Sequence, residues 1–179
     1  MVHYTVKLLL HACCADCVLK FIESAKADNF DEVVVYYYNP NIHPRSEYLT
    51  RLKAIQDTLL PLNIKIIVAD YSPKDYFAVV KNPDKPARCI NCWNLRLSKT
   101  ADYAAKNGYT HFSSTLVTSE YQDTATITSI ANNLSKKLNI KFYIPDHICC
   151  DLKTTGFYKQ FFCGCVYSLT ERYQEKYSK

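Results

Sequence analysis

The sequence contains little glycine and no long apolar run. Only three of its 179 residues are glycine, Gly108, Gly156 and Gly164, and none lies in the loop directly after the first apolar segment, residues 6–10. A phosphate-binding loop needs glycine there so that the backbone can approach the anion closely, which argues against an ATP-dependent enzyme of that kind. The apolar runs are shorter than the roughly 20 residues that cross a bilayer, so we expect no membrane partner.

The amino-terminal stretch also lacks the apolar length of a signal peptide, so we expect a cytoplasmic protein. Hydrophobic residues make up 48% of the chain, which is too many for a disordered protein. The sequence has no repeat, low-complexity tract or obvious linker. Residues 1–179 are therefore expected to form one domain with a sizeable core.

The charge balance permits a nucleic-acid partner without requiring one. The formal net charge is +5, from 22 basic and 17 acidic residues, and many proteins of this charge bind no polyanion. Most of the 15 tyrosines and 8 phenylalanines are expected in the core, although some could stack on bases.

Apolar segments alternate with stretches of helical periodicity along the chain. The expected strands are rich in aliphatic, β-branched and aromatic residues and cover residues 6–10, 33–38, 64–69, 110–115 and 141–144. The expected helices cover residues 16–28, 48–60, 92–106, 123–138 and 166–177, with a short one between 71 and 88. This alternation predicts an α/β fold with a five-stranded parallel sheet and helices on both faces.

The fold predicts where a site would lie. In such sheets, ligands bind beyond the carboxyl ends of the strands, at the topological switch point. Cys13 comes just after the first expected strand, and residues 115–123 come just after the fourth. The first cysteines of the chain therefore fall where this fold class has its active site.

Cysteine is the most informative residue type here. Seven of the nine cysteines form three tight clusters: Cys13, Cys14 and Cys17; Cys89 and Cys92; Cys163 and Cys165. In a reducing compartment such clusters more often bind metal or perform redox chemistry than form structural disulfides. Packing of buried cysteines is the alternative, and it is the one we favour for Cys149 and Cys150.

The first cluster lies at a strand-to-helix junction. The free N–H groups and the dipole of the helix start are expected to lower the thiol pKa values there. Adjacent Cys13 and Cys14 suit two iron atoms of one cluster, or a cluster and a second metal, better than a single zinc ion. Asp16 could ligate a hard metal or cap the helix, and we favour the cap.

The second cluster, Cys89 and Cys92, has the C-x-x-C spacing of zinc sites and of redox dithiols. With Cys13 and Cys14 it supplies four thiolates, the number that an iron–sulfur cubane takes. A structural zinc ion is the alternative. Arg88 could neutralise an anionic cluster or could be a solvated surface residue.

In the third cluster, Cys163-Gly164-Cys165, the cysteines are too close for easy joint ligation of one tetrahedral zinc ion. A C-x-C pair can form a strained, labile disulfide, and Gly164 supplies the backbone freedom that the small ring requires. We therefore predict a redox pair, with metal ligation and packing as the alternatives.

Three other polar features have two interpretations each. Asp123 is equally suited to capping a helix and to facing a substrate. His11 could donate a hydrogen bond to a ligand of the metal cluster, but a core histidine with satisfied hydrogen bonds is favoured. Residues 38–42, Tyr-Asn-Pro-Asn-Ile, are expected to form a plain turn.

Together, these segments resemble the QueH family of epoxyqueuosine reductases. The matching stretches are LLHACCADC at 9–17, YYNPNI at 37–42, RCINCWNLRL at 88–97 and FYKQFFCGCVYS at 157–168. The likeness extends from about residue 7 to 168. It implies a HUP-like doubly wound fold and reductive removal of the epoxide oxygen from epoxyqueuosine at the wobble position of tRNA, which gives queuosine without cobalamin.

The resemblance also implies the roles of the cysteines. The implied ligands of a [4Fe-4S] cluster are Cys13, Cys14, Cys89 and Cys92. The implied redox-active pair is Cys163 and Cys165. A second, mononuclear metal, iron or zinc, is also implied, and its nearest candidate ligands are Cys17 and Asp16. Asp16 stands where the family usually has proline, and the stretch before residue 157 is shorter than usual.

The implied reaction needs two electrons, two protons and an external electron donor to reset the cysteine pair. Asp123 and Tyr158 are candidate proton sources. The partner would be a tRNA anticodon loop carrying epoxyqueuosine, whose exposed bases suit stacking on aromatic side chains. The candidate phosphate contacts are Lys153, Lys159, Arg172 and Lys176.

Two functions of other classes compete with this one. A zinc-stabilised RNA-binding module would contain zinc and no iron. A general thiol–disulfide oxidoreductase would use Cys89 and Cys92 on protein disulfides.

Overall fold

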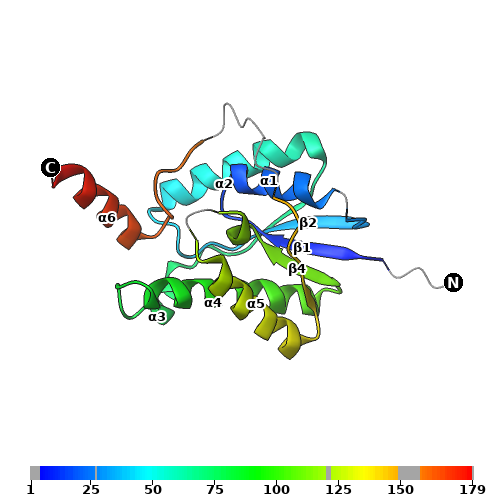
Figure 1. Cartoon of the computed structure of the whole chain (residues 1–179). Helices are drawn as coiled ribbons and strands as arrows, with labels where there is room; N and C mark the ends of the chain where they lie inside the picture. Colours follow the sequence, from blue (N-terminus) through cyan, green and yellow to red (C-terminus); the bar gives the residue numbers. More distant parts are fainter. Residues whose placement is uncertain (1–4, 27, 120–121, 149–157, 179) are drawn as a thin grey trace.

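The computed structural model describes residues 5–26, 28–119, 122–148 and 158–178 (Figure 1). Its centre is a parallel five-stranded sheet with the order β3-β2-β1-β4-β5. The strands are β1 Lys7–His11, β2 Glu32–Tyr37, β3 Ile66–Val68, β4 His111–Ser114 and β5 Lys141–Phe142. The predicted doubly wound α/β fold is confirmed.

Helices follow the strands in the predicted alternation. Their bounds are α1 Ala15–Ala25, α2 Arg45–Leu59, α3 Pro73–Val79, α4 Ala87–Lys106, α5 Thr124–Leu138 and α6 Val166–Tyr177, with 3-10 turns η1 Leu60–Leu62 and η2 Thr115–Thr118. Figure 1 shows α1 and α2 on one face of the sheet and α3, α4 and α5 on the other. None of the helices in the described ranges is both long and apolar enough to cross a membrane.

The core forms around the central strand. Leu8, Leu9 and Leu10 of β1 have no exposed surface, because a parallel strand covered by helices on both faces needs apolar side chains on both of its sides. The predicted apolar stripe of α1 packs on this sheet, with Val18 and Phe21 fully buried. The core therefore fixes the β1 carboxyl end, where the first cysteines follow.

Helix α4 begins earlier than predicted. The sequence placed its start near Cys92, but the helix starts at Ala87, because the backbone N–H of Arg88 already donates to the Asp84 carbonyl and that of Ile90 to the Pro86 carbonyl. Proline is well tolerated at a helix start. As a result Cys89 and Cys92 lie one turn apart on the same side of a helix.

The strand order reverses between β1 and β4, which lie side by side although 100 residues separate them in the chain. This is the topological switch point, and the crevice beyond it is the expected position of a ligand in such sheets. The loop after β1 and turn η2 after β4 form its two sides. Helix α6 extends away from the sheet at the carboxyl end of the chain (Figure 1).

Candidate active site

The three cysteine clusters meet at the carboxyl edge of the sheet. All of their members are free thiols: Cys13, Cys14, Cys17, Cys89, Cys92, Cys163 and Cys165. The thiol of Cys163 interacts electrostatically with those of Cys13 and Cys89, and that of Cys92 interacts with Cys165. Three segments far apart in the sequence therefore bring their thiols to one site.

The first cluster corrects one expectation. The pKa of the Cys13 thiol lies well above its usual value because the thiol hydrogen-bonds to Cys14 and is shielded from water. The hydrogen bond with Cys13 lowers the pKa of Cys14, but the one with Cys17 and burial raise it to about 12. The predicted lowering is therefore wrong for Cys13 and Cys14 as free thiols, because the net effect of burial and hydrogen bonding within the cluster raises both pKa values.

A buried arginine lies behind the second cluster. Burial raises the pKa of Cys92 to about 12, and Arg96 opposes this rise. Arg96 is only 1% exposed. Burial acts to lower its own pKa, but the nearby Cys92 and Cys13 keep it above the usual value. Within the described part of the chain its Nε and Nη2 groups have no hydrogen-bond partner, so this guanidinium is suited to an adjacent anionic group.

These residues fit an iron–sulfur group by their chemistry. The four thiols of Cys13, Cys14, Cys89 and Cys92 are the number that a [4Fe-4S] cluster takes, and metal binding would displace the protons that their raised pKa values otherwise retain. Among the residues that the structure describes, no three Cys, His, Asp or Glu side chains are already arranged to hold a single metal ion. The thiols would therefore have to turn toward a bound metal.

Helix α2 holds the loop that carries the third cluster. Arg51, 2% exposed, donates from Nη2 to the Phe162 carbonyl at 3.0 Å and from Nη1 to the Cys163 carbonyl at 3.3 Å. Its guanidinium also lies over the Phe162 ring, 5.2 Å from the centroid. The His43 backbone N–H donates to the Gly164 carbonyl at 2.8 Å. Three consecutive carbonyls of the loop are thus bound by the body of the protein.

Gly164 is required at its position. Its φ is +119°, and a Cβ atom there would lie 3.1 Å from Ile42 Cγ1 and 3.3 Å from Arg51 Nη1. Other residues rarely adopt this φ, and the space for a side chain is also occupied. The positive φ agrees with the predicted backbone freedom of Gly164, although both cysteines are free thiols and no disulfide ring is formed. Close packing against Ile42 and Arg51 is a second reason for glycine.

The two cysteines of this loop have different surroundings. Cys163 is exposed, whereas Cys165 is buried and accepts the Ser168 backbone N–H at the start of α6 at 3.4 Å. Although Cys163 is exposed, the protein around its thiol displaces part of the surrounding water; this raises the pKa of Cys163, and Arg96 opposes the rise. Gln122 lies beside it, with its Nε2 4.0 Å from Cys163 Sγ. One thiol is therefore open to a reaction partner and the other is enclosed.

Arg51 and Arg96 were missed in the sequence, although a signal exists. Arg51 lies three residues after Tyr48 and four before Ile55, and all three are buried. Arg96 follows Cys92 by four residues, again on the buried face of its helix. A charged residue inside an apolar stripe needs a partner. Arg51 binds Glu47 and the carbonyls of the C-x-C loop, whereas Arg96 lies beside the thiols of Cys92 and Cys13.

His11 is a satisfied core histidine, as favoured from the sequence. Its Nε2 lies 3.1 Å from the Tyr38 carbonyl and its Nδ1 2.8 Å from the Ser114 hydroxyl. Because a carbonyl can only accept, Nε2 carries the proton and the hydroxyl donates to Nδ1. Burial lowers the pKa of His11 to about 3, so the ring is neutral and ties β1 to the ends of β2 and β4.

The two acidic candidates behave differently from each other. Asp123 caps α5: its Oδ1 accepts the Thr126 backbone N–H at 3.0 Å and its Oδ2 accepts the Thr126 hydroxyl at 2.6 Å, and these bonds lower its pKa. Asp16 does not cap α1, since the helix starts one residue earlier with Cys14 in the capping position. The favoured cap is therefore wrong for Asp16, which instead pairs with Lys20 one turn on, at 3.1 Å.

The turn after β2 is more than a plain turn. Asn39 donates from Nδ2 to the Ala12 carbonyl at 2.7 Å, which joins the turn to the loop after β1. Asn41 is 1% exposed, and neither polar atom of its side chain has a hydrogen-bond partner in the described ranges. Unpaired buried amides are rare and costly, so Asn41 is a further candidate for contact with a bound group.

Some expected residues are not placed at the site. Cys149, Cys150 and Lys153 lie outside the described residues. Tyr158 is described, and its hydroxyl donates to Glu47, which in turn accepts from Arg51 Nε at 2.7 Å. Tyr158 therefore belongs to the support of the C-x-C loop.

Known proteins are similar to almost the whole chain. The family model described as Epoxyqueuosine reductase QueH matches residues 8–171. Among relatives with that name, the protein from Dehalococcoides mccartyi is 37% identical, over 93% of this chain and 94% of its own length. The protein from Haemophilus influenzae is 34% identical, over 92% and 72%, and that from Thermotoga maritima is 30% identical, over 96% and 94%. The chain therefore belongs to the QueH family of epoxyqueuosine reductases and is an oxidoreductase.

Proposed function

We propose that this protein reduces the epoxide of epoxyqueuosine, at the wobble position of tRNA, to the alkene of queuosine. One observation carries the proposal beyond family membership: seven thiols from three distant segments meet at the switch point of the sheet, above a buried arginine with unpaired donors. Epoxide removal consumes two electrons and two protons and releases water, and clustered thiols suit such a reduction.

In this proposal Cys13, Cys14, Cys89 and Cys92 hold a [4Fe-4S] cluster, which supplies single-electron transfer when bound. The charge of Arg96 compensates the negative charge of the thiolates. A second, mononuclear metal, iron or zinc, would take ligands from the first turn of α1.

The candidate ligands for that second metal are Cys17 and Asp16. They lie in successive positions of α1, and Asp16 would exchange its ion pair with Lys20 for the metal. The ion pair is only partly buried, so the exchange costs little.

The Cys163 and Cys165 dithiol would provide the reducing equivalents. Its conversion to a disulfide releases two electrons and two protons, which balances the conversion of an epoxide to an alkene and water. An external electron donor would then reduce the disulfide. The exposure of Cys163 suits attack by such a donor, and the anchored backbone of the loop keeps Cys165 beside it.

The proton source is best assigned to the thiols. The lowered pKa of Asp123 keeps its carboxylate ionised, so as a catalytic group it would accept a proton or a hydrogen bond. Burial and the bond to Glu47 raise the pKa of Tyr158 to about 12, so its hydroxyl holds its proton. The raised pKa of Cys163 keeps that thiol protonated until it reacts.

The tRNA partner would approach across the outer side of this loop. Lys159 is exposed there, and Arg172 on α6 donates to the Phe161 carbonyl at 2.9 Å. Lys176 lies over the Tyr177 ring, 5.2 Å from its centroid. These cations and aromatic rings offer phosphate and base contacts.

The first test is the metal content and activity of anaerobically purified protein. We expect about four irons and four sulfides per chain and turnover of epoxyqueuosine in an anticodon stem-loop RNA. Cys163→Ser should abolish turnover and leave the iron content and visible spectrum unchanged, with Cys149→Ser as a control that retains both.

Three outcomes would contradict the proposal. Turnover by Cys163→Ser would remove the dithiol role. Zinc alone, even after cluster reconstitution, would favour the zinc-stabilised RNA-binding module. Reduction of protein disulfides without iron would favour a general thiol–disulfide oxidoreductase.

A further inference from the structure

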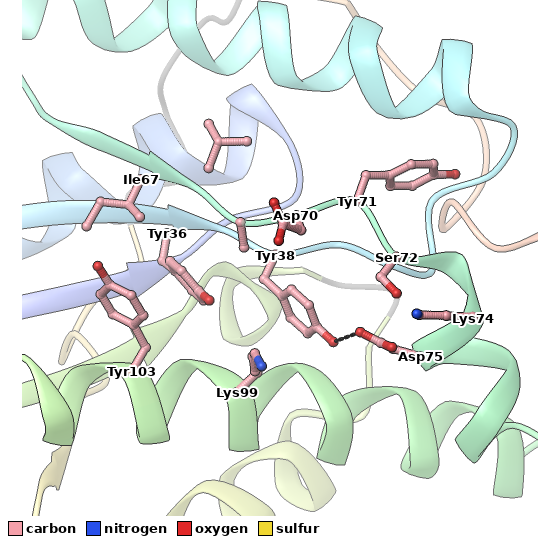
Figure 2. Close-up of a pocket in the computed structure, with 12 residues that line it drawn as sticks. Tyr36, Tyr38, Ile67, Asp70, Tyr71, Ser72, Lys74, Asp75, Lys99 and Tyr103 are labelled. Carbon is pink, nitrogen blue, oxygen red and sulfur yellow. Dashed lines mark hydrogen bonds between the residues drawn. The ribbon is translucent and has the colours of Figure 1, made fainter.

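A groove of about 700 Å³ opens beside the thiol site, between the β3 side of the sheet and helices α3 and α4. Figure 2 shows Tyr36 and Tyr38 pointing from the sheet toward α4, where Lys99 and Tyr103 face them. None of the cysteines is among the residues that line it. The groove is therefore separate from the redox chemistry described above.

One side of the groove is a ladder of tyrosine rings. Tyr36 stacks on Tyr103 with centroids 4.8 Å apart and on Tyr38 at 6.4 Å, with interplanar angles of 25° and 20°. Tyr36 and Tyr38 are buried, whereas Tyr103 is half-buried at the open end. Beside this ladder, the edge strand β3 contributes Ile67, which pairs with Tyr36 and therefore lies on the same face of the sheet. An aromatic surface with an aliphatic neighbour suits a flat, π-bonded ligand.

The rim of the groove carries both cations and carboxylates. Lys99 lies over the Tyr38 ring, 5.9 Å from the centroid, and Lys74 is exposed at the start of α3. Asp75 accepts the Tyr38 hydroxyl at 3.2 Å (Figure 2), and Asp70 is exposed on the opposite side. A nucleotide matches this arrangement, because its phosphate needs cations while the N–H groups of its base need acceptors.

The groove continues the thiol site along one face of α4. Cys92, Arg96, Lys99 and Tyr103 follow each other at intervals of four, three and four residues, which places them on the same side of a helix. Lys99 lies roughly 10 Å along the helix axis from Cys92. The Tyr38 hydroxyl also interacts electrostatically with Cys92. A nucleotide in the groove would thus be close enough to belong to the same RNA loop as a nucleotide at the thiols.

We infer that this groove binds an unstacked base of the tRNA anticodon loop next to the reacting nucleotide. The base stacks at Tyr103, its N–H donors face Asp70 or Asp75, and Lys99 and Lys74 contact the phosphates. The inference rests on the proposed function for its RNA partner. It adds a second binding position, which holds the loop open while the epoxide lies at the thiols.

The test uses the cluster-containing protein and an unmodified anticodon stem-loop RNA. Lys99→Glu should weaken RNA binding at least tenfold, because it removes a phosphate contact and adds a repulsive charge. Lys137→Glu, the same change on an exposed lysine of α5, should alter the affinity less than threefold. Equal effects of the two variants would overturn the inference.

A second comparison tests stacking directly. Tyr103→Leu should weaken binding roughly fivefold or more, as expected for loss of one base–aromatic stack, while Tyr103→Phe should retain the affinity. We then compare the intact RNA with RNAs that carry an abasic residue on the 5′ or the 3′ side of the wobble position. Wild type should bind one of these abasic RNAs more weakly than the intact RNA. Tyr103→Leu should bind that abasic RNA and the intact RNA with the same affinity, because it has already lost the stack. Additive losses at both abasic positions would contradict a stack at Tyr103.

Turnover separates this inference from the function on which it rests. If wild type converts epoxyqueuosine RNA, Lys99→Glu should raise KM and leave kcat and the iron content near wild type. Wild-type turnover with no change in Lys99→Glu would refute the groove alone. Failure of wild-type turnover would refute the proposed function, whatever the RNA binding of the variants.

Discussion

Gly164 joins a backbone requirement to a packing requirement at one residue. Gly164→Ala forces a side chain into a φ of +119° and against Ile42 and Arg51. We expect a loss of about 1–3 kcal/mol in the free energy of unfolding, together with slower oxidation of the Cys163 and Cys165 pair, because the loop must shift. Urea unfolding and the rate of disulfide formation measure the two effects.

Gly108→Ala is the matched control. Its φ is +73°, but a Cβ atom there meets nothing within 4 Å in the described structure, so only the backbone cost of about 1 kcal/mol applies. Oxidation of the cysteine pair should proceed at the wild-type rate. If both variants slow oxidation equally, the effect of Gly164 comes from general destabilisation and not from the loop.

His11 gives the protein a defined acid sensitivity. Its pKa is lowered from 6.5 to about 3 in the folded protein, so between these values the unfolded chain binds the additional proton. The stability is therefore full above pH 6.5 and falls as the pH decreases toward 3. At pH 5 the free energy of unfolding should be about 2 kcal/mol lower than at neutral pH because of His11.

Urea unfolding of the metal-free protein between pH 4 and 8 measures this slope. His11→Gln lacks the titrating group and should show a shallower decrease below pH 6.5, even if it is less stable at every pH. Parallel curves for the variant and the wild type would assign the acid sensitivity to other residues.

At the scale of single elements, helix α5 depends on its cap. Asp123→Ala removes two hydrogen bonds to Thr126, and we expect the melting temperature to decrease by a few degrees. Asp123→Ser retains a capping oxygen and should restore most of the stability. If Asp123 is only a cap, Asp123→Ser should also convert epoxyqueuosine RNA at the wild-type rate. A stable Asp123→Ser variant that does not convert this RNA would support a catalytic role.

The elements themselves were largely predictable, because periodic apolar patterns and Asn, Pro and Gly signals mark most of them. The C-terminal helix begins at Val166, as predicted, directly after the capping Cys165. The start of α4 was not predictable in the same way. Pro86 and Ala87 carry no apolar periodicity, and the carbonyls that accept the first hydrogen bonds of the helix belong to Asp84 and Pro86.

The site was predictable from the sequence in its cysteines but not in its supports. Clustered thiols are recognisable by spacing alone, and the switch-point rule placed the first cluster correctly. Arg51 binds the carbonyl of Phe162, which lies more than 100 positions away in the sequence. Arg96 reaches the thiols because its helix is packed with that side chain buried. Such contacts depend on the tertiary fold, so no local pattern specifies them.

At the scale of the whole molecule, the thiol site should couple metal binding to stability. The loop after β1, helix α4 and the loop before α6 bring their thiols together there, so a ligand held by thiols of two segments links them. We expect the cluster-containing protein to melt several degrees above the metal-free protein, as measured by anaerobic calorimetry. Equal melting temperatures would mean that the cluster is not held between segments.

The support of the C-x-C loop acts on its main chain. Arg51 and His43 bind the carbonyls of residues 162–164, and carbonyls are the same in every amino acid. The frame of the loop is therefore independent of the side chain at position 163. We expect that this position can be exchanged for serine or selenocysteine without releasing that frame, so the atom proposed to react can be varied while its surroundings stay constant.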